Sequence, residues 1–85
     1  MKSFEYEIKD ELGLHARPAG MLVKKAKEFS SSITIKAGGK SGDAKKLFAL
    51  MAMGVACGNV VTVTVEGDDE ESAASALKLF FSENL

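Results

Sequence analysis

Cysteine, histidine and proline each occur only once among the 85 residues, and the 11 basic residues nearly balance the 12 acidic ones. One cysteine cannot form an intramolecular disulfide, so we expect a reducing, cytoplasmic location. No apolar segment is long enough to cross a bilayer, and the alternating start of the chain lacks a signal peptide's apolar run, so we expect neither membrane insertion nor secretion. The net charge of −1 lacks the strongly basic face that nucleic-acid binding requires, so we expect no nucleic-acid partner.

The single cysteine, Cys57, has no second histidine or acid with which to form a catalytic set, and no ligand partners for a metal. We therefore interpret it as a small structural thiol and expect no metal site. The hydrophobic content of 46% and charged content of 27% are ordinary for a soluble globular protein. A chain of this length predicts one domain, residues 1–85, with one modest core.

Hydrophobic periodicity predicts seven elements in the order βαββαβα. Period-two alternation indicates strands around residues 4–8, 33–37 and 59–66, and Gly38-Gly39 indicates a hairpin into a short strand at 40–42. Helical spacing predicts a first helix that begins between Ala16 and Pro18 and ends near Phe29, and a brief second helix from residue 47. A third helix follows, for which we expect Asp68 and Glu71 as caps and a buried stripe of Ala73, Leu77, Phe80 and Phe81.

This order predicts an α+β fold in which the helices cover one face of a four-stranded, mostly antiparallel sheet. The polar alternates of the strands should then face solvent.

Residues 13–20, Gly-Leu-His-Ala-Arg-Pro-Ala-Gly, contain the features that point to chemistry. An isolated histidine is more often a cap or a surface residue than a reactive group. However, His15 precedes a helix start, where backbone N–H groups lack partners and the helix dipole is positive. Arg17 adds a guanidinium that can bind phosphoryl oxygens through paired hydrogen bonds. The helix end and Arg17 both disfavour an imidazolium, so we expect a neutral, nucleophilic ring.

This octapeptide resembles the active-site loop of HPr, the histidine-containing phosphocarrier family of the bacterial phosphoenolpyruvate-dependent sugar phosphotransferase system. The similarity extends through Gly39-Lys40-Ser41, residues 44–48, Gly54-Val55 and Gly58 with the valine strand that follows. It implies the family's open-faced β-sandwich with three helices on one face.

The resemblance implies a phosphocarrier rather than an enzyme. His15 would accept a phosphoryl group at Nδ1 from phosphorylated enzyme I and pass it to the A domain of a sugar-specific enzyme II. The amides of Ala16 and Arg17 would contact that group, and no cofactor would be needed.

A docking surface is expected on the short second helix, because its consecutive apolar residues cannot all be buried. The resemblance places this helix beside the histidine, and lysines, Lys45 among them, could surround it. The expected partner-binding residues are Ala16, Gly20, Lys24, Lys27, Leu47, Phe48 and Met51.

Two positions depart from the family pattern. The family usually has a serine, often a regulatory phosphorylation site, where this chain has Lys46, so we expect no regulatory serine. Gly20 stands where the family usually has a small residue that is larger than glycine.

Two alternative functions stay open: an HPr-like regulatory or docking module that carries no phosphate, and a carrier in a regulatory phosphorelay. A monomer is expected.

Overall fold

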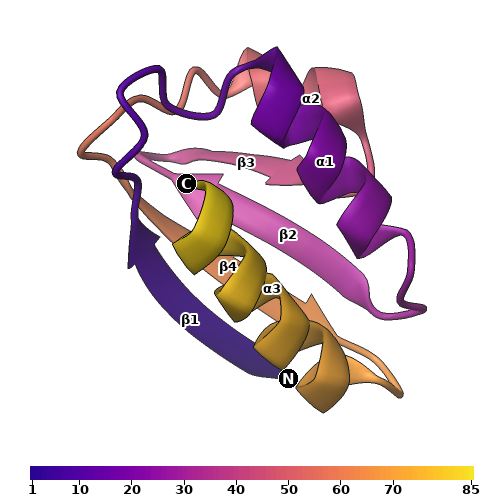
Figure 1. Cartoon of the computed structure of the whole chain (residues 1–85). Coiled ribbons are helices and arrows are strands. Elements are labelled where there is room, and N and C mark those ends of the chain that lie inside the picture. Colours follow the sequence, from indigo (N-terminus) through magenta and orange to yellow (C-terminus); the bar gives the residue numbers. More distant parts are fainter.

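The computed structural model describes all 85 residues, and its seven elements follow the predicted βαββαβα order (Figure 1). The strands are β1 (Lys2–Glu7), β2 (Ser32–Ala37), β3 (Lys40–Asp43) and β4 (Val60–Glu66). The helices are α1 (Ala16–Ala26), α2 (Leu47–Ala52) and α3 (Glu70–Asn84).

The four strands form one sheet in the order β1-β4-β2-β3, and every neighbouring pair is antiparallel. The predicted hairpin joins β2 to β3, with Ala37 opposite Lys40. Gly38 and Gly39 occupy its turn at φ values of +54° and +83°, which side chains rarely tolerate. The last strand of the chain therefore lies inside the sheet, between the first two.

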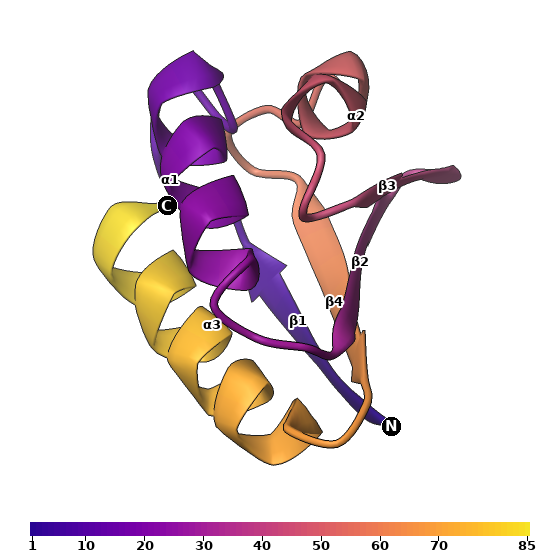
Figure 2. The same cartoon turned by 90° about the vertical axis from the view of Figure 1, so that its right-hand side faces the viewer.

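Helices α1 and α3 cover one face of the sheet, and α2 lies beside α1 next to β3 (Figure 2). The alternation in β4 explains this arrangement, because Val61, Val63 and Val65 are fully buried while the two threonines between them are only half-buried. The open-faced α+β fold is confirmed.

The core is centred on Phe81 of α3, which is 1% exposed. The rings of Phe4 and Tyr6 meet it edge-on, at centroid distances of 5.9 and 5.5 Å. Such pairs add about 0.5–1.5 kcal/mol each to the gain from burial alone. These contacts hold α3 on β1, so the end of α3 has a defined place near the loop that precedes α1.

Helix α1 begins at Ala16, within the predicted range, but ends at Ala26 rather than near Phe29. The chain tightens there, since Glu28 and Phe29 donate to carbonyls three residues back, at 3.1 and 3.2 Å.

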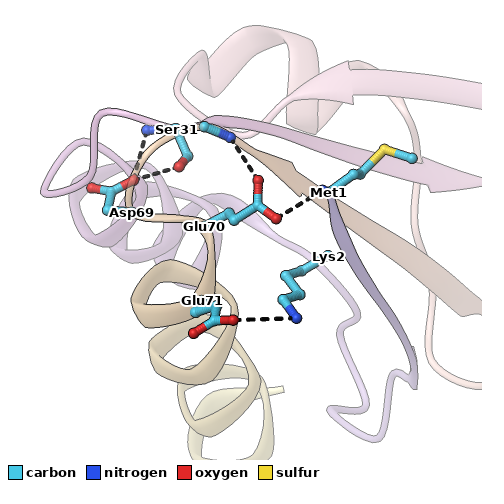
Figure 3. Close-up of polar contacts among 7 residues, drawn as sticks. Met1, Lys2, Ser31, Asp69, Glu70 and Glu71 are labelled. Atoms are coloured by element: carbon cyan, nitrogen blue, oxygen red, sulfur yellow. Dashed lines mark hydrogen bonds and ion pairs between the residues drawn. The ribbon is translucent and has the colours of Figure 1, made fainter.

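The predicted cap of α3 by Asp68 and Glu71 is wrong. Asp69 occupies the cap position, and its carboxylate accepts hydrogen bonds from the amide and the hydroxyl of Ser31 (Figure 3). It also accepts one from the Ser30 amide, at 2.9 Å. Glu70 instead accepts from the Gly67 amide, at 3.2 Å. The serine loop, Ser30 and Ser31 before β2, is far in sequence from Asp69, but these hydrogen bonds tie it to the start of α3.

Candidate functional site

The loop before α1 is pinned to the segment between α2 and β4. Gly13 has a φ of +67°, and a Cβ at this position would lie 2.4 Å from the Val55 carbonyl oxygen. The same oxygen accepts the Leu14 amide at 3.0 Å, and the Leu14 side chain is buried. Glycine is therefore required at position 13, both for the positive φ and for the close approach to Val55. The pinned loop determines where His15, two residues later, is held.

His15 is the N-cap residue of α1, with an extended backbone whose carbonyl accepts the Ala19 amide at 2.9 Å. Its side chain makes no capping hydrogen bond and is 34% exposed. The amides of Ala16 and Arg17 make no backbone hydrogen bond, and Pro18 has no N–H to donate. Two unpaired donors and the positive end of the helix thus adjoin the imidazole, as an anion site requires.

A surface hollow of about 230 Å³ opens beside the imidazole. Arg17 is exposed at its wall and makes no ion pair with any acid of the chain. The structure thus brings the two predicted phosphate-handling side chains together. The hollow is lined by Asp10, His15, Arg17, Pro18, Met21, Glu83 and Asn84.

Four of these lining residues were missed by sequence reasoning. Met21 lies on α1 and Asp10 in the preceding loop, and both are within six residues of His15, so the helix register and the loop could have suggested them. Glu83 and Asn84 come from the end of α3, and no local pattern indicates that they reach this hollow.

The expected docking residues on α2 differ in exposure. Phe48 is 83% exposed and Met51 is 42% exposed, whereas Leu47 is half-buried and packs against the core. We call these three residues the α2 patch. An exposed phenylalanine on a helix that packs beside α1 is typical of an interaction surface.

The expected partner-binding positions on α1 are mostly open to solvent. Ala16, Lys24 and Lys27 are exposed and Gly20 is half-buried. Lys45, by contrast, is not available to surround the α2 patch, because its Nζ donates to the Phe29 carbonyl at 2.7 Å and ties the start of α2 to the turn after α1.

Lys46 is the N-cap residue of α2, with an extended backbone at φ −125°. Its side chain is exposed and makes no capping hydrogen bond. The structure shows no compensating cap for this unusual residue at a helix start.

The interpretation of Cys57 as a structural thiol does not fit its environment. Its side chain is exposed, and its only hydrogen bond is a weak one to the Lys9 carbonyl, at 3.8 Å. The next residue, Gly58, donates its amide to the Ile8 carbonyl at 2.7 Å, so the turn that carries Cys57 is bound to the residue that follows β1.

None of the helices is both long enough and apolar enough to cross a membrane.

Nearly the whole chain is similar to known proteins. Residues 2–83 match the family model PTS-HPr, described as the HPr component phosphorylation site. The phosphocarrier protein HPr of Haemophilus influenzae is 46% identical over 77 residues, which cover 91% of each chain.

Two solved structures of HPr from Thermoanaerobacter tengcongensis bear on fold and assembly. One superposes with a TM-score of 0.93 at 44% identity, covering 98% of this chain and 93% of the other. The second, a dimer, superposes with a TM-score of 0.77 at the same identity, covering 98% and 95%. A monomer therefore stays a prediction. The match over nearly the full length, with His15 and Arg17 at the helix start, shows that this chain belongs to the HPr phosphocarrier family of the phosphotransferase system.

Proposed function

We propose that this chain carries a phosphoryl group on His15, accepting it from phosphorylated enzyme I and passing it to the A domains of sugar-specific enzymes II. The observation that supports this most is the N-cap position of His15, beside two unpaired amides and the exposed Arg17. We propose that it works in the cytoplasm, as a monomer, without a cofactor.

In the transfer step, the lone pair of Nδ1 forms the new bond to phosphorus while the donor's bond to phosphorus breaks and the donor keeps that electron pair. Arg17 and the amides of Ala16 and Arg17 offer hydrogen bonds to the phosphoryl oxygens. These donors lie at the surface, where water competes with them, so they stabilise the anion only moderately. Moderate stabilisation suits a carrier, which must also release the group.

The α2 patch and the exposed lysines of α1 are proposed to dock both partners. Phe48 supplies an apolar anchor, while Lys24 and Lys27 would attract acidic rims. Because Lys46 offers no hydroxyl, we propose that this surface is not regulated by serine phosphorylation at that position.

The second candidate is a docking module that binds partners without carrying phosphate. Its support is the same exposed α2 patch, which does not require His15 at all. Both functions can be distinguished by one chemical property, the uptake of phosphoryl.

The test is incubation with enzyme I and phosphoenolpyruvate, followed by intact-mass measurement. We expect the gain of one phosphoryl group, stable in base and labile in acid. The control is His15→Ala, whose fold is checked by circular dichroism. Absence of the gain in the native chain, or its persistence in the folded variant, would contradict the proposal.

A further inference from the structure

Asp10 stands beside the imidazole on the side of Nε2. Its Oδ1 lies 3.9 Å from Nε2, and both side chains are about one-third exposed. No other acid of the chain comes within ion-pair distance of the ring. The other charged groups lining the hollow are Arg17 and Glu83.

The position of Asp10 is determined by several hydrogen bonds. Its Oδ1 accepts the Leu12 amide at 2.9 Å, and its carbonyl accepts the Gly13 amide at 2.9 Å. Its own amide donates to the Leu85 carbonyl at 2.8 Å. The carboxylate therefore has a fixed position, unlike that of a surface acid whose side chain rotates freely.

We propose that Asp10 is a positioning residue that keeps the imidazole proton on Nε2. A negative charge near Nε2 favours an N–H there and disfavours a lone pair. The lone pair then lies on Nδ1, the atom to which the proposed function assigns the phosphoryl group. This inference rests on that proposed function.

The same carboxylate acts in the transfer step. When the Nδ1 lone pair bonds to phosphorus and the proton stays on Nε2, positive charge develops on the ring. Asp10 stabilises that charge and keeps the proton on Nε2. When the phosphoryl group moves on, the ring therefore takes back the electron pair on Nδ1 and leaves as a neutral imidazole, which is a better leaving group than an imidazolate. Asp10 thus assists both directions of a reversible relay.

The first test is nitrogen NMR of the unphosphorylated chain labelled with 15N-histidine, at a pH where the ring is neutral. Because His15 is the only histidine, its two nitrogens give the tautomer directly. We expect the native ring to carry its proton mainly on Nε2. A native ring protonated mainly on Nδ1 would overturn the inference, whatever any variant shows.

The matched variants are Asp10→Asn and Glu11→Gln. Asparagine keeps an oxygen for the Leu12 amide but removes the charge, whereas Glu11 is an exposed neighbour with no contact to the ring. We expect the ratio of the Nε2–H to the Nδ1–H tautomer to fall about two- to fivefold in Asp10→Asn, since one nearby charge is lost. Glu11→Gln should keep the native ratio. An unchanged ratio in Asp10→Asn, or an equal fall in Glu11→Gln, would overturn the inference.

Transfer from enzyme I is measured on the same proteins, and we expect a fall of about fivefold in rate for Asp10→Asn alone. An unchanged rate would overturn the role in transfer. Failure of the native chain to be phosphorylated would instead contradict the proposed function, and the tautomer measurement does not depend on it.

Discussion

Arg17 is exposed, lies outside the core and forms no ion pair with an acid. Its side chain lines the hollow beside His15. Arg17→Ala should therefore change the free energy of unfolding by no more than about 0.5 kcal/mol. Transfer from enzyme I should slow about tenfold or more, because a charged donor to the phosphoryl group is lost. Quenched phosphoryl-transfer assays measure the change in rate, and urea denaturation measures the change in the free energy of unfolding.

The control for Arg17 is Lys25→Ala, which removes a positive charge from the same helix. Lys25 pairs with Glu28 at 3.5 Å, away from the hollow, so transfer should stay at the native rate. Equal slowing in both variants would mean that overall charge, and not contact with phosphate, explains the effect.

His15 and Arg17 were predictable as a pair because they are neighbours in sequence and the proline after them marks the helix start. The position of Asp10 was not, since its approach to the ring depends on the turn made by residues 10–13 and on main-chain bonds to Leu85. The sequence alone could therefore indicate the histidine that we propose as phosphoryl acceptor, but not the carboxylate that lies beside its Nε2.

At the scale of the elements, Gly13 and Gly20 make a matched pair. Gly13→Ala would place a Cβ at positive φ and within 2.4 Å of the Val55 carbonyl, so we expect a loss of at least about 1–2 kcal/mol in stability. Gly20 is helical and has no atom within 4 Å of its added Cβ, so Gly20→Ala should gain about 0.5–1 kcal/mol. Thermal unfolding of the two variants should shift in opposite directions. An unchanged or raised midpoint in Gly13→Ala would show that the loop is not pinned as described, and a lowered midpoint in Gly20→Ala would contradict the open space at that position.

The α2 patch leads to a prediction about binding. Phe48→Glu should weaken binding to enzyme I about tenfold or more, because an exposed aromatic anchor becomes a charge. Stability should change by no more than about 0.5 kcal/mol, since Phe48 is 83% exposed. Calorimetric titration against enzyme I checks the first effect and circular dichroism the second.

A matched control for Phe48 is Leu79→Glu, which alters an apolar residue of α3 that is 59% exposed. Binding should keep its native affinity in this variant. Native affinity in Phe48→Glu as well would remove the α2 patch from the docking surface.

At the scale of the whole molecule, long-range ties that local sequence does not reveal hold the layers together. Alternation indicated the strands, but it does not say that β4 inserts between β1 and β2. The sequence predicted Asp68 and Glu71 as caps and assigned no role to Asp69, yet Asp69 binds Ser30 and Ser31, 39 and 38 residues earlier in the chain. Hydrophobic periodicity indicates which face of each element is buried. Contacts between distant residues depend instead on how the helices pack on the sheet.

The tie between Asp69 and the serine loop predicts an acid-sensitive stability. Hydrogen bonds from the Ser31 hydroxyl and the Ser30 amide lower the pKa of Asp69 below its ordinary value of 3.8. The unfolded chain therefore takes up a proton more readily than the folded one. The stabilisation is fully present above pH 3.8 and is lost as pH falls through the lowered folded-state pKa.

Denaturation curves between neutral and strongly acidic pH measure this effect. We expect the decline in stability at low pH to be shallower in Asp69→Asn than in the native chain. Asp68→Asn, which alters an exposed neighbour without these hydrogen bonds, should keep the native decline. If Asp69→Asn also keeps it, the tie does not contribute to acid sensitivity.

Because His15 is the only histidine, the proposed phosphoryl transfer to its Nδ1 can be measured directly. The chain is labelled with 15N-histidine and phosphorylated by enzyme I and phosphoenolpyruvate, and nitrogen–phosphorus coupling is then recorded. We predict coupling to phosphorus at Nδ1 and a proton retained on Nε2. Coupling at Nε2, or a phosphorylated chain whose imidazole shows no coupling, would contradict the proposal.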